Sequence, residues 1–158
     1  MDDQAVVSWQ LGRPARPFRR VARRCPYGFP AVTEQDPLDP DGAPFPTTYY
    51  LTCPWLVAAL ARREAAGGVR EWTARAASDP ELAASLARAD EEQRRIRPEL
   101  DSGIAGRRNG TLKCLHAHAA FALARPGYEL GERILAEAGD TWCPDGRCGT
   151  RPGGEGAG

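Results

Sequence analysis

The pattern of apolar and polar residues predicts short strands early in the chain and helices after them. The segment "FRRVARR" at residues 18–24 is typical of a strand, and it ends in the turn Cys25-Pro-Tyr-Gly28. "FPAVTEQ" at 29–35 would return as the second strand of a hairpin. "TTYYLT" at 47–52 has high β-propensity and predicts a third strand. The proline-rich stretch between the second and third strands indicates a rigid, turn-rich loop.

Apolar residues with helical spacing fill most of the remaining chain, between proline and glycine breaks. The predicted helices cover residues 2–11, 54–66, 69–77, 80–97, 112–124 and 129–139. Pro54 fits the first position of its helix, with Thr52 or Cys53 as the N-cap. Strands followed by helices favour an α+β fold. We expect a small N-terminal β element, a hairpin plus one further strand, packed with about five helices.

Length and charge restrict the class of protein. The chain has 158 residues, which fits a single domain, expected at residues 1–148 with a core at about 11–135 and a disordered tail at 149–158. Its 21 basic and 21 acidic residues balance, so no overall charge favours nucleic acid or an anionic membrane. No window approaches the ~18 apolar residues of a membrane span. The N-terminus lacks a signal-peptide pattern, which predicts a cytoplasmic protein.

Both histidines stand beside a cysteine in "TLKCLHAHAAF" at residues 111–121. In a helix, Cys114 and His118 are four residues apart and share one face, whereas His116 points elsewhere. The predicted helix is apolar nearly all round and is therefore expected to be buried. One face could supply two metal ligands, but not all three residues.

The other cysteines stand near turns and at an element end. Cys53 would begin a helix, where free N–H groups and the helix dipole favour a thiolate. Cys25 precedes Pro-Tyr-Gly in a tight turn. Cys143 and Cys148 form a Cys-x4-Cys pair that could bind a metal independently, although an incidental role is favoured. In a reducing compartment, five cysteines indicate thiols or ligands rather than a disulfide framework.

Three motifs, in their order and spacing, resemble the domain of unknown function 501 family, which consists of short, mainly actinobacterial proteins. The motifs are "RRCPYGFPAV", "PFPTTYYLTCP" and "KCLHAHAAFALA". The resemblance covers roughly Leu11 to Leu135 and implies an uncharacterised cytoplasmic protein with no established reaction. The signature positions correspond here to Cys25, Gly28, Pro46, Thr47, Tyr50, Cys53, Pro54, Lys113, Cys114, His116 and His118. After the histidine helix the chain has "RPGYELGE", where relatives often carry Asn-Pro-x-Gly.

The first functional hypothesis is a metal site with the ligands Cys25, Cys53, Cys114 and His118. Sulfur and imidazole are the ligands of structural zinc, and three cysteines can also hold an iron–sulfur cluster with an open iron. These candidate ligands are scattered, with no Cys-x2-Cys pair to support them. The alternative is that the cysteines are small buried hydrophobic residues and His118 is a hydrogen-bonded core histidine.

Two other hypotheses come from different classes of protein. In a thiol enzyme, Cys53 would be the nucleophile and His116 or His118 its base. Thr47, Thr48 and Tyr50 would then supply hydroxyl groups. In a noncatalytic interaction module, an arginine-rich segment would meet an acidic or phosphate-bearing partner. That segment contains Arg13, Arg16, Arg19, Arg20, Arg23 and Arg24 and no acid. Whether the protein is an enzyme stays open at this point.

Overall fold

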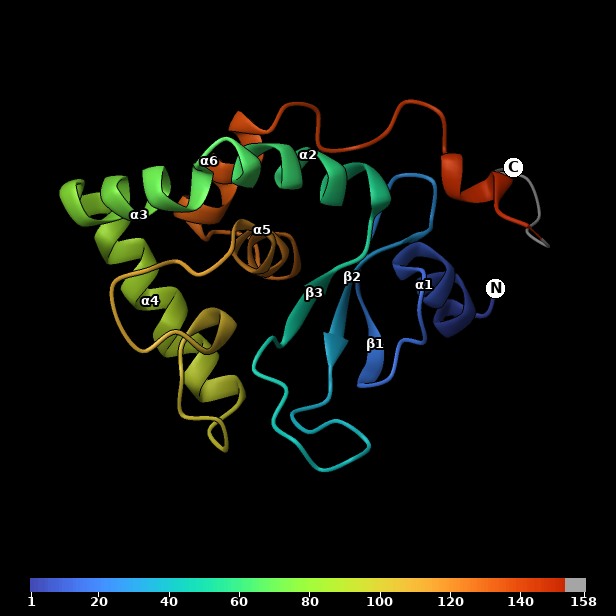
Figure 1. Ribbon diagram of the computed structural model, residues 1–158, viewed down its shortest axis with the longest axis horizontal. Coiled ribbons are helices and arrows are strands. Elements are labelled where there is room, and N and C mark those ends of the chain that lie inside the picture. Colours follow the sequence, from blue (N-terminus) through green and yellow to red (C-terminus); the bar gives the residue numbers. More distant parts are fainter. Residues whose placement is uncertain (153–158) are drawn as a thin grey trace.

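A three-stranded antiparallel sheet forms one side of the protein in a computed structural model that describes residues 1–152 (Figure 1). The strands are β1 (Phe18–Arg24), β2 (Pro30–Gln35) and β3 (Tyr49–Leu51), in the order β1-β2-β3. The β1–β2 hairpin closes where the Gly28 N–H donates to the Cys25 carbonyl over 2.9 Å. Gly28 has φ +87°, a conformation that favours glycine at this turn. β2 is buried along its whole length because it is the central strand and both α1 and α5 pack on it.

Six α-helices make up the rest of the regular structure within residues 1–152. They are α1 (Asp3–Leu11), α2 (Pro54–Ala65), α3 (Gly68–Ser78), α4 (Pro80–Ile96), α5 (Leu115–Ala124) and α6 (Glu129–Glu137), with two 3-10 turns, η1 (Ile104–Gly106) and η2 (Arg147–Thr150). Asp79 caps α4 by accepting a hydrogen bond from the Glu81 N–H over 2.9 Å. The predicted α+β fold is confirmed. None of these helices has the length and apolar character needed to cross a membrane.

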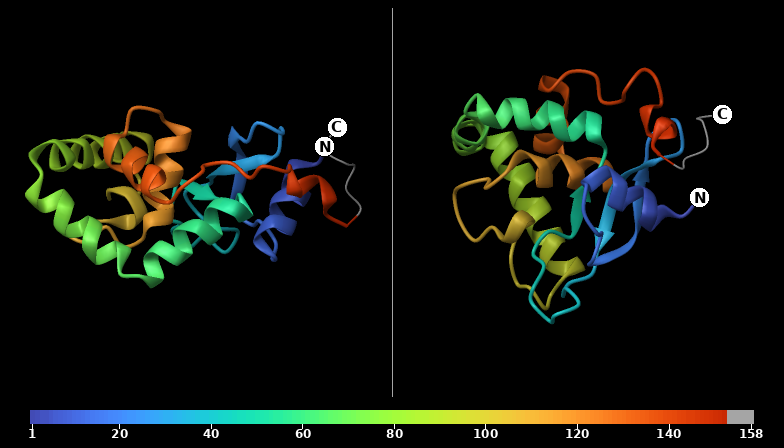
Figure 2. Two further views of the ribbon diagram at one scale, coloured as in Figure 1. Left: turned by 90° about the horizontal axis from the view of Figure 1, so that it is seen from above. Right: turned by 45° about the vertical axis from the view of Figure 1, so that its right-hand side comes forward.

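α5 lies at the centre of the helical half, between α2, α6 and β3 (Figures 1 and 2). The Phe121 ring packs edge-on against Tyr49 of β3 and against Tyr128, with centroids 5.5 and 5.8 Å away. Gly131 lets α6 approach closely, because a Cβ at this position would lie only 2.6 Å from the His118 carbonyl oxygen. The apolar character of "LHAHAAFALA" is thus explained by contacts on several sides.

Two predictions about the ends of elements were wrong. α5 begins at Leu115 and not near Leu112, because Lys113 has φ +69° and Cys114 is extended. A left-handed residue cannot continue a right-handed helix. Gly149 and Thr150, predicted as the start of the disordered tail, belong to η2. Residues 153–158 of that predicted tail lie outside the described residues.

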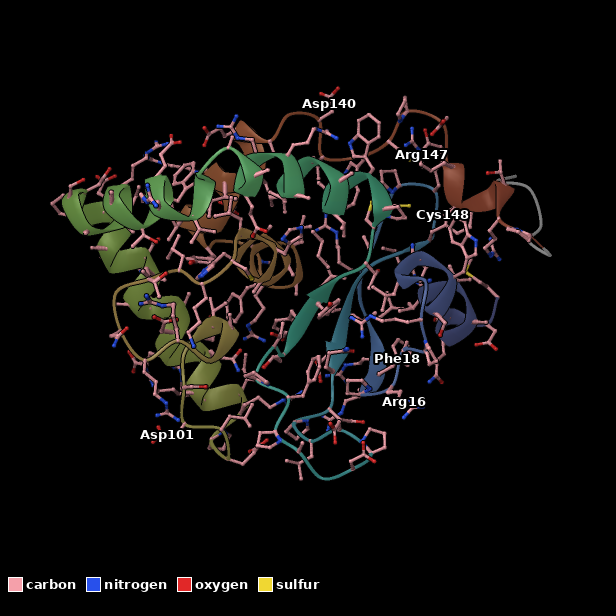
Figure 3. All side chains as sticks on the ribbon, viewed as in Figure 1. Arg16, Phe18, Asp101, Asp140, Arg147 and Cys148 are labelled. Carbon is pink, nitrogen blue, oxygen red and sulfur yellow. The ribbon has the colours of Figure 1, made fainter. Side chains whose placement is uncertain are left out.

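The segment after α6 runs back along α2 and ends near α1 (Figures 1 and 3). Trp55, near the start of α2, holds this segment at two points. Its indole N–H donates to the Asp140 carbonyl over 2.8 Å, and the Arg147 guanidinium lies 4.7 Å above its ring. The labelled residues Asp140, Arg147 and Cys148 trace this path in Figure 3. The C-terminal segment is therefore attached to the domain, although it lies beyond the predicted core.

Candidate functional site

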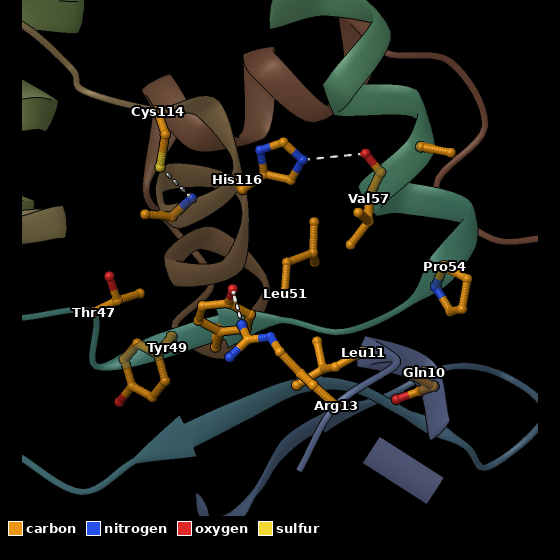
Figure 4. Close-up of a pocket in the computed structure, with 13 residues that line it drawn as sticks. Gln10, Leu11, Arg13, Thr47, Tyr49, Leu51, Pro54, Val57, Cys114 and His116 are labelled. Carbon is orange, nitrogen blue, oxygen red and sulfur yellow. Dashed lines mark hydrogen bonds between the residues drawn. The ribbon is translucent and has the colours of Figure 1, made fainter. Parts of the chain in front are cut away.

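A pocket of about 560 Å³ lies between α1, β3, α2 and α5 (Figure 4). Most of its wall is apolar, with Leu11, Leu51 and Val57 among the lining residues. The residues that carry polar groups are Gln10, Arg13, Thr47, Tyr49, Tyr50, Cys114 and His116. Both the volume and the mixture of an apolar wall with a few polar groups are typical of small-molecule sites.

Two sequence motifs meet at this pocket, although more than fifty residues separate them. The motif "PFPTTYYLTCP" forms β3 and the start of α2, and it contributes Thr47 and Tyr50. The motif "KCLHAHAAF" contributes Cys114 and His116 from the start of α5. Their contact follows from the packing of α5 against β3, which buries the apolar side of both elements.

His116 is held by groups on α2. Its Nε2 lies 3.1 Å from the Val57 carbonyl oxygen, and its Nδ1 lies 3.2 Å from a Glu64 carboxylate oxygen. The same carboxylate oxygen accepts the Leu115 N–H over 2.7 Å at the start of α5. Both contacts are with oxygen atoms that act as acceptors, and together they fix the orientation of the His116 ring at the wall of the pocket.

Arg13 supplies a positive group, from the α1 side. Its Nη2 donates to the Tyr50 hydroxyl over 2.8 Å, and the guanidinium lies 5.8 Å from the Tyr50 ring centroid. Figure 4 shows Gln10 and Arg13 on this side and Cys114 and His116 on the α5 side. No aspartate or glutamate is among the residues that line the pocket. The described wall therefore favours an anion over a cation.

Cys114 is a capping residue and not an activated nucleophile. Its Sγ accepts the Ala117 N–H over 3.4 Å at the first turn of α5. Burial is the main cause that raises the pKa of this thiol, and the nearby Glu64 carboxylate raises it further. The group is therefore a neutral thiol at neutral pH.

Cys53 occupies the predicted position at the start of α2, but the predicted activation is wrong. Only 7% of the residue is exposed, and burial raises the pKa of its thiol. The N–H groups of Leu56 and Trp55 lower the pKa, as expected at a helix start, but neither makes a standard capping hydrogen bond. Desolvation thus outweighs the helix terminus. Cys53 also lines a different cavity from His116, so these two candidate catalytic residues do not form a pair.

His118 is a hydrogen-bonded residue of the core. It is fully buried, its Nε2 donates to the Leu112 carbonyl over 3.0 Å, and its Nδ1 accepts from the Tyr128 hydroxyl over 2.8 Å. Burial lowers its pKa to about 4, which keeps the ring neutral. The prediction that His118 shares a helix face with Cys114 was wrong, because Cys114 precedes the first helical residue.

The four predicted metal ligands do not converge as a set. Cys25 and Cys53 line one small cavity, Cys114 lines the pocket described above, and His118 is inside the core. Among residues 1–152, no group of three or more His, Cys, Asp or Glu side chains is arranged to hold a metal ion. The cavity shared by Cys25 and Cys53 is also lined by Cys143 and Cys148. That proximity was missed, because the spacing of the cysteines in the sequence contains no sign of it.

Most arginines of the predicted partner surface have contacts within the protein. Arg13 and Arg23 bond to Tyr50 and to the Leu123 carbonyl, and the ion pairs are Arg19–Asp36, Arg20–Glu34 and Arg24–Asp3. Arg16 is exposed. Much of the positive charge of this segment is therefore balanced by acids from other parts of the chain.

Two residues of the pocket region were not predicted as parts of a site. Glu64 stands in the helical segment "ALARREAAGG", where a charged residue is typical of any exposed helix. Gln10 belongs to the N-terminal helix, and its side-chain amide donates to the Pro30 carbonyl over 2.7 Å. Neither position carries a signal in the sequence, since both roles depend on how the helices pack.

The fold and the pocket define a class: a small α+β protein in which a strand motif and a helix motif meet at one pocket. Residues 21–136 match the family described as "Protein of unknown function (DUF501)", and the chain belongs to this family. The match excludes Arg13 on one side and both Cys143 and Cys148 on the other. No curated protein and no solved structure matches the chain.

Proposed function

We propose that this protein binds a small organic anion, with an apolar body, in the pocket between α1, β3, α2 and α5. The observation that carries the proposal is the composition of the pocket wall. Apolar side chains from four elements surround the Arg13 guanidinium and the His116 ring, and the only carboxylate held against either group among the described residues, Glu64, contacts His116 from outside the lining. A guanidinium matches the planar, bidentate geometry of a carboxylate or phosphate.

These groups support the binding of a ligand and not a reaction in which a thiol attacks it. The pKa of Cys114 is raised, and both ring nitrogens of His116 already face acceptors. A base needs a free nitrogen lone pair, and a thiol nucleophile needs thiolate character. The same groups are suited to recognition, because His116 is fixed by α2 and Arg13 by Tyr50 before a ligand arrives. Such preorganisation lowers the entropic cost of binding.

The proposal is tested by screening the full chain against aliphatic and aromatic carboxylates and phosphate monoesters. Thermal-shift measurements identify the anions that stabilise the protein, and calorimetry gives their dissociation constants. Loss of one charge-assisted hydrogen bond costs about 1.5–3 kcal/mol, so Arg13→Ala should weaken binding roughly ten- to hundredfold. His116→Gln should weaken binding in the same direction.

Arg16→Ala is the matched control. Arg16 is exposed and belongs to the same arginine-rich segment, but it does not line this pocket. Its replacement should leave the dissociation constant unchanged. The proposal is wrong if no anion of the panel binds, or if Arg13→Ala and Arg16→Ala weaken binding equally, since equal effects indicate nonspecific attraction to a basic surface.

A further inference from the structure

We propose a second site: a tetrahedral zinc site in which the four ligands are the thiolates of Cys25, Cys53, Cys143 and Cys148. It differs from the predicted metal site, because Cys114 and His118 are replaced by the two cysteines of the C-terminal segment. It is also separate from the anion pocket, since none of these four cysteines lines that pocket.

The four cysteines come from three parts of the chain that the fold brings to one small cavity. Cys25 belongs to the hairpin turn, Cys53 precedes α2, and Cys143 and Cys148 flank a turn in the segment after α6. The volume available inside this cavity is about 10 Å³. This is close to the space for one water molecule, so it suits a single ion and not an iron–sulfur cluster.

The sulfurs line this cavity as free thiols, and they are not in coordination geometry as they stand. A cysteine sulfur can move between staggered χ1 positions without a change of its backbone. Binding of Zn²⁺ would turn the four sulfurs inward, release their four protons and leave the metal divalent. No oxidant or reductant enters this step.

Polar groups around the cavity are suited to thiolates. The Gln10 amide donates to the Cys148 sulfur over 3.5 Å, and the first N–H groups of α2 lie near the Cys53 sulfur. Donors of this kind orient and stabilise metal-bound sulfur. The Cys53 side chain itself occupies the N-cap position of α2, where a hydroxyl or carboxylate acceptor is more common.

Three arginines lie near the four cysteines and would offset part of the double negative charge of a zinc ion with four thiolates, since Arg24 and Arg147 are also paired with Asp3 and Asp145. Arg24 lies near Cys25, Arg147 lies near Cys53 and Cys143, and Arg151 lies near Cys148. Arg151 also donates to the Cys148 carbonyl over 2.8 Å, which fixes its position beside this cysteine. No acid is among the residues that line the cavity.

A metal would also explain how the C-terminal segment keeps its place. Between α6 and η2 this segment has no helix or strand, and its attachments include the Trp55 contacts with Asp140 and Arg147. Segments with little core of their own commonly gain their stability from a structural metal. A site of this kind would join the segment to the hairpin turn and to the start of α2.

The test is zinc loading of the reduced full chain, followed by dialysis and elemental analysis. We expect about one zinc ion per chain. The double variant Cys143→Ser/Cys148→Ser should lose it, and Cys114→Ser should retain it. Cobalt in place of zinc should give thiolate charge-transfer absorption and the visible bands of a tetrahedral ion in the wild type. The double variant should show neither.

Alkylation of the wild type tests the site without any variant, should the double variant fail to fold. Zinc should protect Cys25 and Cys143, the two partly exposed ligands, from N-ethylmaleimide and leave the rate of Cys114 as it is in the metal-free protein, as read by peptide mass spectrometry. The proposal is overturned if the reduced wild type retains no zinc, or if the double variant retains as much. It is also overturned if zinc protects Cys114 and leaves Cys25 and Cys143 reactive. Disulfides among these cysteines, in a protein that binds no zinc once reduced, would likewise reject it.

Discussion

The Tyr128 hydroxyl donates a hydrogen bond to Nδ1 of His118 over 2.8 Å, inside the core. Burial raises the pKa of Tyr128 strongly, so the hydroxyl keeps the proton that it donates. His118 in turn donates from Nε2 to the Leu112 carbonyl. One neutral tautomer of the histidine thus satisfies two buried polar groups, the Tyr128 hydroxyl and the Leu112 carbonyl. The role of His118 in the structure is to connect α5, the segment before it and the residue that precedes α6.

Tyr128→Phe removes this donor and leaves Nδ1 of His118 without a partner. An unsatisfied buried acceptor costs about 1–3 kcal/mol, while the edge-on contact of the ring with Phe121 is retained. We expect a fall of this size in the free energy of unfolding, measured by urea denaturation. Tyr27→Phe is the matched control, because Tyr27 is 41% exposed, and its effect should be near zero. Equal effects of the two variants would contradict the assigned hydrogen bond.

The folded state should lose stability as the pH falls from about 6.5 to about 4. The pKa of His118 is lowered from its ordinary value of 6.5 to about 4, so in this window the unfolded chain binds a proton that the folded chain does not. Protons therefore favour unfolding, and the full loss from this group is about 3 kcal/mol.

The His118→Gln variant separates this effect from other titrations. Burial alone would raise the pKa of Glu34, but its contacts with Arg20 and Arg97 together lower the pKa in the folded state, so part of the loss in acid belongs to that carboxylate. Urea denaturation across this pH range should show a smaller change for His118→Gln than for the wild type. The same pH dependence in both proteins would show that His118 is not the group responsible.

Arg97→Ala should destabilise the protein by about 1–3 kcal/mol, because it removes the buried partner of Glu34 and the donor to the Gln35 carbonyl, while Glu34 keeps its ion pair with Arg20. Arg97 Nη2 lies 3.2 Å from the Glu34 carboxylate, and both side chains are only 7% exposed. The same nitrogen also donates to the Gln35 carbonyl over 2.8 Å. Thermal or urea unfolding measures the loss. The exposed Arg95→Ala is the control and should change stability little.

Gly131→Ala should separate α5 from α6. A Cβ at this position would lie 2.6 Å from the His118 carbonyl oxygen and 2.7 Å from Ala122 Cβ, both on α5. Neither atom belongs to a flexible side chain, so the helices must move apart, at a cost of about 1–3 kcal/mol. Gly110→Ala has open space around the new Cβ and serves as the control. If Gly131→Ala melts at the same temperature as the wild type, the close packing of α5 and α6 is contradicted.

Cys53 in the metal-free, reduced protein should react slowly with iodoacetamide at neutral pH. Burial both raises its pKa and restricts access to the sulfur. Peptide mass spectrometry after timed alkylation should show a rate below that of a free cysteine in solution. A faster rate would restore the thiol-enzyme hypothesis, in which the helix start activates Cys53.

The sequence by itself determined the elements and the family. The strand-like segments and the turn residues between them predicted the hairpin, and Pro54 and Asp79 predicted the starts of α2 and α4. These signals can be found in the sequence because they depend only on residues that are neighbours in the chain. The start of α5 was missed, since the positive φ of Lys113 is not encoded by a glycine. The three motifs were sufficient for the family, which residues 21–136 confirm.

Only the tertiary structure decided which side chains meet. Cys114 and His116 face the same pocket because α5 begins one residue after Cys114, and His118 is buried because α5 packs against α6 and β3. The return of the C-terminal segment along α2 places Cys143 and Cys148 beside Cys25 and Cys53. Contacts between residues far apart in the chain arise from the packing of whole helices. Spacing within a single motif therefore cannot predict them.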